Sequence, residues 1–258
     1  MSDTKGDKHV EVYDSFRVTD SIQIGVRDYL SLSHIWAACF FSRSAGALEA
    51  NDDGLAARDQ RHFAHVVASI GAAGDFLDRT INELIQDAHD GNPGGPTQHM
   101  TAAQRAAIAT VQPLAALRRT PVLEKYNLVA VAAGVAPLGR GSGAGQDAVL
   151  LLAVKNALSH SVPETVTTIS DEPNALTVQE MEQRLRTLKL PRNPFAGPAQ
   201  PFFPRVVATR ELTAWTCHTA MTYVETYFRL FAVPPPFEHM RTGLALTARS
   251  DPPGGNST

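Results

Sequence analysis

Four polar residues gather at the end of an otherwise apolar helical segment, and their types could carry out acid–base chemistry. The segment 150–160 is almost wholly apolar apart from Lys155, Asn156, Ser159 and His160. Pro163 follows closely and cannot continue a helix, so the segment reads as the last turns of a buried helix. Asn156 and His160 are four residues apart and share a face, and the long stem of Lys155 can reach around to them.

A cation, an amide and an imidazole suit the cleavage of RNA without a metal ion. That reaction needs a base for the 2′-hydroxyl, an acid for the departing 5′-oxygen and positive charge beside the phosphate. His160 can act as base or acid near neutral pH, Lys155 can stabilise the phosphate charge, and Asn156 can orient the phosphate or the ring. Because one imidazole cannot be acid and base at once, we expect two copies of the site to face each other in a homodimer.

The same residues also fit a purely structural interpretation. A histidine in the last turn interacts favourably with the carbonyl end of a helix, and Asn156 can hydrogen-bond to the chain that follows. In that case His160 and Asn156 only end the helix. Both interpretations stay open at this point.

The rest of the chain predicts helices that could position this segment, and it shows no alternation of strands with helices. We therefore expect an all-α fold, an irregular bundle of about five to seven helices with an extended N-terminal arm. Ser31 or Ser33 is a candidate N-cap for the first helix, and Gly71 and Gly74 predict a close helix–helix approach inside the long second one. The expected helices cover about 31–50, 55–88, a short piece after 101, 124–133, 146–161, 177–188 and 206–232, with a flexible glycine loop at 139–145.

We expect a single helical domain over 31–240. Residues 1–30 form the expected arm, in which a loose alternation over 9–28 allows a short β-ribbon. Residues 241–258 form the expected disordered tail, polar and rich in Pro and Gly.

Composition favours a cytoplasmic protein and argues against several functional classes. The net charge of −3 disfavours a protein that coats nucleic acid nonspecifically. Cys39 and Cys217 lie in apolar helical contexts, a pattern typical of buried thiols in a reducing compartment. No signal peptide or membrane span is expected. His62 and His65 lack partners at metal-ligand spacing and are expected at the surface or at a cap, so we expect no metal and no cofactor.

Lys155-Asn-Ala-Leu-Ser-His160 resembles the Arg-Asn-x-x-x-His helix motif of HEPN domains, and the wider chain resembles a bacterial HEPN-like group over roughly 31–232. The shared features are a long helix with Asn82-Glu83-Leu84, a Lys125-Tyr126 pair and Pro163-Glu164 after the motif. The later Phe202-Phe-Pro204 segment and the Ala214-Trp215 helix are also similar.

The resemblance implies an all-α bundle, a homodimer and, in many members, metal-independent RNA cleavage at the dimer cleft. It makes His160 the general acid or base, Asn156 the orienting residue and Lys155 the phosphate contact, with lysine in place of the usual arginine. Lysine keeps the charge but loses the planar fork. Other members are noncatalytic interaction or nucleotide-binding modules, which is the alternative function for this chain.

Overall fold

A computed structural model describes residues 27–50, 55–111, 113, 116–139, 141–159 and 176–245. Nearly all of the expected N-terminal arm, His160 and the last part of the expected tail lie outside these residues. The possible β-ribbon is therefore neither supported nor contradicted.

The described residues form eight α-helices and contain no β-strand, which confirms the expected all-α class. Six of these helices have ten residues or more, consistent with the predicted five to seven. Two 3₁₀ turns, Gly95–Thr97 and Glu238–Met240, and a π-helical turn, Phe202–Val206, join them. The α-helices are α1 Leu30–Ala50, α2 Leu55–His89, α3 Ala102–Ile108, α4 Val122–Ala132, α5 Gly143–Ser159, α6 Val178–Thr187, α7 Arg210–Arg229 and α8 Arg241–Leu244.

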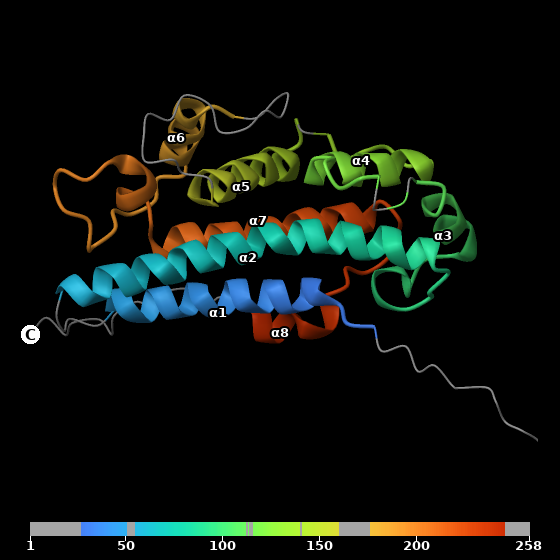
Figure 1. Cartoon of the computed structure of the whole chain (residues 1–258), viewed down its shortest axis with the longest axis horizontal. Coiled ribbons are helices and arrows are strands. Elements are labelled where there is room, and N and C mark those ends of the chain that lie inside the picture. The colour runs from blue at the N-terminus through green and yellow to red at the C-terminus, as the bar shows by residue number, and fades with distance from the viewer. Residues whose placement is uncertain are drawn as a thin grey trace, which may run out of the picture.

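Helix α2 is the spine of the bundle, and the other long helices pack around it. Helices α2 and α7 lie side by side, with α1 and α8 on one side of them and α4, α5 and α6 on the other (Figure 1). Helix α5, which carries the Lys155 segment, contacts α2, α7 and α6. The apolar stripe of α2 supplies much of the core, which includes Phe76, Leu77, Ile81, Leu84 and Ile85.

Three tyrosines hold α4 and α7 against the spine. The ring of Tyr126 meets those of Tyr223 and Tyr227 edge to face, with centroids 5.1 Å and 4.6 Å apart. The Tyr126 hydroxyl donates to the carbonyl of Leu77, and the Tyr227 hydroxyl donates to the carbonyl of Tyr126. Burial raises the pKa of Tyr126 well above its usual range, so this phenol stays neutral and keeps its donor.

Side-chain caps set the starts of several helices. Thr101 and Gln104 form a reciprocal capping box at α3, and Thr177 with Glu180 forms another at α6. The prediction that Ser31 or Ser33 is the N-cap of α1 was wrong, because α1 already begins at Leu30. Ser31 lies inside the first turn of α1, where its N–H and Oγ donate to the carboxylate of Glu83 at 2.9 Å and 2.5 Å. The first turn of α1 is therefore satisfied by a residue of α2.

Three boundaries differ from the predictions. Helix α5 starts at Gly143, inside the expected glycine loop, because the Ser142 hydroxyl accepts the N–H of Gly145 as an N-cap does. Helix α7 starts at Arg210 behind the Thr209 cap, and not near 206. Residues 241–244, expected to be disordered tail, form α8, which packs on α1 and buries Leu244.

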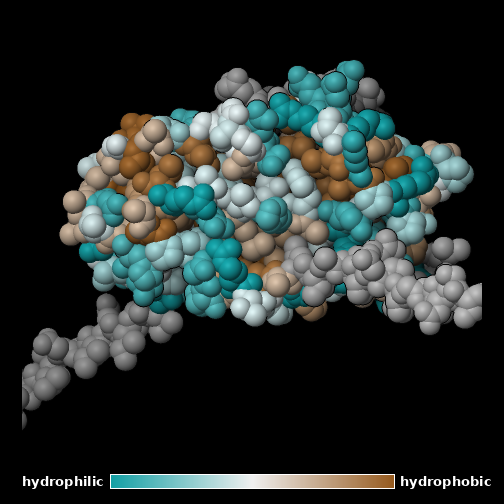
Figure 2. All heavy atoms as spheres, turned by 180° about the vertical axis from the view of Figure 1, so that it is seen from behind, coloured by the Kyte–Doolittle hydropathy of each residue, from teal (hydrophilic) through white to brown (hydrophobic). Residues whose placement is uncertain are grey.

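The surface keeps some apolar groups. On the face shown in Figure 2, hydrophobic side chains gather in two patches separated by more polar residues. Among the described residues, five large hydrophobic side chains are exposed: Leu30, Trp36, Phe40, Leu128 and Val131. Both cysteines are buried and free, as their sequence context predicted.

Candidate functional site

The structure places Lys155 and Asn156 in the last turns of α5, both half-buried. The Lys155 ammonium donates to the carboxylate of Asp75 on α2, with Nζ and Oδ1 2.6 Å apart. The two side chains are 22% and 43% exposed, so the pair lies at the solvent-accessible margin of the α2–α5 contact. Helix α5 ends at Ser159. His160, the third predicted site residue, is the next residue in the chain and lies outside the described ranges.

Gly74 allows this contact to form. A Cβ atom at Gly74 would lie 2.5 Å from Cδ of Lys155, so the glycine leaves room for the lysine stem to cross α2. This confirms the expected close approach at Gly74. At Gly71 the expectation was wrong, because nothing lies within 4 Å of an added Cβ there.

A second lysine joins α4 to the same side of α2. The Lys125 ammonium donates to Asp78 at 2.8 Å and to Asn82 at 2.9 Å, and Lys125 is only 6% exposed. Asp75, Asp78 and Asn82 recur at steps of three and four residues, so they form one polar stripe along α2. Two separate sequence segments, around residues 125 and 155, thus converge on this stripe. The sequence reasoning missed Asp75 and Asp78, although their helical spacing from Asn82 was a visible signal.

The Lys155–Asp75 ion pair limits how Lys155 can bind a phosphate. An ammonium at 2.6 Å from a carboxylate is already charge-compensated, so a phosphate must compete with Asp75 to reach it. Both partners keep contact with water, which makes that exchange less costly than it would be for a buried pair. Lys125 is nearly buried and bound by two acceptors, which gives it a structural role at the α2–α4 contact.

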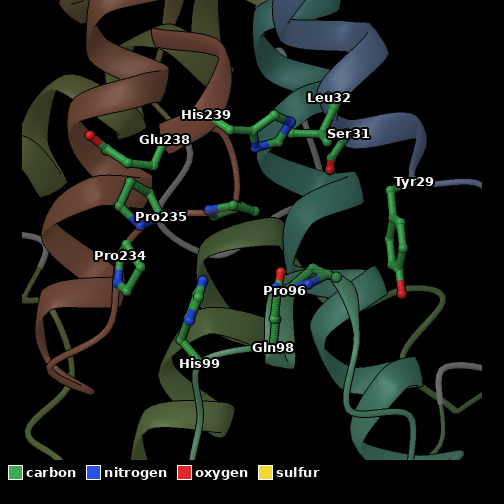
Figure 3. A pocket seen from close by; sticks show the side chains of 12 residues that line it. Tyr29, Ser31, Leu32, Pro96, Gln98, His99, Pro234, Pro235, Glu238 and His239 are labelled. Carbon is green, nitrogen blue, oxygen red and sulfur yellow. The ribbon is translucent and has the colours of Figure 1, made fainter.

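A sizeable cavity lies at another place in the fold and was not predicted. Its volume is about 670 Å³, within the size range of small-molecule pockets. Two imidazoles, His99 and His239, line it from different segments, as Figure 3 shows. The remaining walls come from the start of α1, the Gly95 turn and the proline run after α7, and include Tyr29, Leu32, Pro96, Pro234, Pro235 and Pro236.

This cavity does not suit a phosphodiester. No lysine or arginine belongs to its described lining, whereas the carboxylate of Glu238 does. Glu238 is bound by Arg241, whose Nη2 lies 2.7 Å from Oε2. The prolines at 234–236 are visible in the sequence and could have indicated one wall of this cavity. Nothing in the sequence indicates that His99 and His239 line the same cavity.

His62 corrects a further expectation. Its ring is wholly buried and not at the surface, with Nε2 2.7 Å from Oε1 of Glu49 and its centroid 4.9 Å from that of Phe195. The same Glu49 oxygen accepts the backbone N–H of Arg210 at 2.7 Å, so this carboxylate joins the ends of α1, α2 and α7. Within the described residues no group of three or more His, Cys, Asp or Glu side chains could hold a metal ion.

None of the described helices combines the length and the apolar character that crossing a bilayer requires. The class that the fold defines is an all-α bundle built around one long helix. No protein family model, curated protein or solved structure matches the chain.

Proposed function

We propose that the protein is a HEPN-like, metal-independent ribonuclease whose site combines Lys155, Asn156 and His160 at a homodimer cleft. The observation that carries the proposal is the position of Lys155 and Asn156. Both keep partial contact with solvent in the last turns of α5, whereas Leu150, Leu151 and Val154 on the same helix are buried. Lys155 and Asn156 therefore lie at the margin of the core, which supports their contact with a substrate.

In this mechanism His160 takes the proton of the 2′-hydroxyl, whose oxygen attacks the adjacent phosphorus. The bond from phosphorus to the 5′-oxygen breaks, and His160 of the second copy gives that oxygen a proton. Lys155 leaves Asp75 to contact the phosphate as its negative charge grows. The products carry a 2′,3′-cyclic phosphate and a free 5′-hydroxyl.

The test compares the purified protein with His160→Ala on mixed RNA in the presence of a chelator. We expect the wild-type protein to cut RNA and to leave cyclic phosphate ends, because no metal takes part. His160→Ala removes the only proposed proton carrier, so cleavage should fall by about 10²-fold or more while the melting temperature stays nearly unchanged. A wild-type protein that cuts no RNA, with a variant that loses stability, would overturn the proposal.

A noncatalytic interaction module is the second candidate, and a specific observation favours it. Trp36 and Phe40 are exposed on α1 and stacked, with centroids 5.5 Å apart and planes 9° from parallel. Exposed aromatic groups of this kind mark binding surfaces. If this pair serves self-association, Trp36→Ser with Phe40→Ser should convert a dimer of about twice 27.8 kDa into a monomer in light scattering. Loss of the dimer without RNA cleavage by the wild type would favour this candidate.

A further inference from the structure

A second concave surface, between the end of α6 and the π-helical turn, carries three cations. Its volume is about 290 Å³, and its charged lining residues are Arg186, Lys189 and Arg192. No carboxylate belongs to its described lining. The chain as a whole has a net charge of −3, so this groove concentrates positive charge against the overall balance. Apolar side chains form the rest of the wall: Leu185, Leu190, Pro191, Phe202, Val206 and Val207.

Two of the cations, Arg186 and Arg192, are held in place by an aromatic ring and a backbone carbonyl. The guanidinium of Arg186 lies over the ring of Phe202, 3.8 Å from its centroid. Its ion pair with Glu182 is long, with 3.9 Å between Nη2 and Oε2, and solvent-exposed, so a phosphate can compete for the guanidinium at little cost. Nη2 of Arg192 donates to the carbonyl of Gly197 at 2.7 Å, which is a neutral partner. In the described part of the chain no carboxylate forms an ion pair with Lys189 or Arg192.

Lys189 occupies a backbone conformation that normally favours glycine. Its φ of 52° lies in the left-handed region, just after α6 ends. Glycine is the usual residue there, since a Cβ is strained in this conformation. A lysine at this position therefore places a charge at the groove at some cost to stability.

We propose that this groove binds the phosphate backbone of single-stranded RNA. Three cations around a small concave surface match closely spaced phosphates, and an aromatic side chain with apolar neighbours suits the bases between them. Helix α6 packs against α5, so the groove belongs to the same side of the bundle as the motif helix. The choice of RNA as the polyanion rests on the proposed function.

The test measures binding of a short fluorescein-labelled single-stranded RNA by anisotropy, in the His160→Ala background so that the RNA stays intact. The groove variant is Lys189→Glu with Arg192→Glu. The matched control is Arg118→Glu with Arg119→Glu, which changes the net charge equally at two exposed residues away from the groove. We expect the groove variant to bind RNA about tenfold or more weakly. The slope of log K against log salt concentration should become shallower by about 0.7 for each lost phosphate contact. The control should bind as its parent does.

Lys189→Gly separates binding from folding. Glycine relieves the left-handed strain, so the variant should melt at the same or a higher temperature while its RNA affinity falls several-fold. Equal weakening by the groove variant and the control would overturn the proposal, because the effect would then follow net charge alone. Binding to anionic phosphatidylserine vesicles in place of RNA would overturn it as well.

The outcomes for the groove and for the ribonuclease are distinguishable. A wild-type protein that binds RNA through the groove but cuts none removes the ribonuclease and leaves the groove. RNA cleavage that persists at full rate when Lys189→Glu and Arg192→Glu are made in the protein that keeps His160, together with full RNA affinity, removes the groove and leaves the ribonuclease.

Discussion

At the scale of single residues, Lys155 separates the two interpretations of the motif. Its stem lies over Gly74 and its ammonium is bound by Asp75, so the same side chain joins two helices and could contact a phosphate. A solvent-accessible ion pair contributes only about 0–1 kcal/mol to stability. Removal of the charge should therefore test the catalytic role with little effect on folding.

Lys155→Met keeps a long stem against Gly74 and removes the charge. We expect kcat/KM for RNA to fall by about 10²–10³-fold, because the phosphate loses its cation, while the melting temperature changes little. The companion variant Asp75→Asn removes the competing carboxylate, so it should leave cleavage intact or faster. Initial-rate kinetics with a labelled RNA give both values. A Lys155→Met protein that cuts at the wild-type rate would show that the lysine is structural.

At the scale of elements, Gly71 and Gly74 provide a matched pair within α2. Either substitution by alanine gains about 1 kcal/mol of intrinsic helix stability. At Gly71 nothing opposes that gain, so Gly71→Ala should stabilise the protein in chemical denaturation. At Gly74 the new Cβ would lie 2.5 Å from the Lys155 stem and displace it, so Gly74→Ala should lose most of the gain.

The Gly71→Ala and Gly74→Ala variants should also differ in activity. Displacement of the Lys155 stem moves the ammonium away from its present position, so Gly74→Ala should also slow RNA cleavage, whereas Gly71→Ala should not. If both variants gain the same stability, the close approach of α5 at Gly74 is not as tight as described.

At the scale of the whole molecule, two carboxylates with opposite pKa shifts predict opposite pH effects on unfolding. Burial raises the pKa of Glu83, although its hydrogen bonds from Ser31 act in the other direction. The stability linked to Glu83 is therefore present below its unfolded pKa and is lost as the pH rises through its folded pKa. Hydrogen bonds from Thr177 lower the pKa of Glu180, so its contribution is present at neutral pH and is lost as the pH falls.

Urea unfolding at about pH 4 and pH 7 tests these signs. Relative to the wild type, Glu83→Gln should gain stability as the pH rises, because it cannot ionise in its buried position. Glu180→Gln should lose stability relative to the wild type over the same interval. Matching pH dependences for the two variants would contradict the assignment of burial as the cause at Glu83.

The predictions that proved accurate rest on interactions between neighbours in the chain. The expected helices over about 31–50, 55–88 and 124–133 correspond closely to α1, α2 and α4, because each follows from periodicity within its own segment. The all-α class and the approximate helix positions follow from the same local rules. The start of α1 was predicted less well, since its partner Glu83 comes from a different helix.

The order of residues along the chain determined the helices, the Lys155–His160 motif and the kinds of chemistry that the side chains of the motif permit. The tertiary structure alone decided that Asp75 holds Lys155, that Asp78 and Asn82 hold Lys125, and that His62 is buried against Glu49. It also decided which cations surround the groove at α6. The physical reason is that these contacts depend on which helix faces meet, and a periodicity defines a face without specifying its partner.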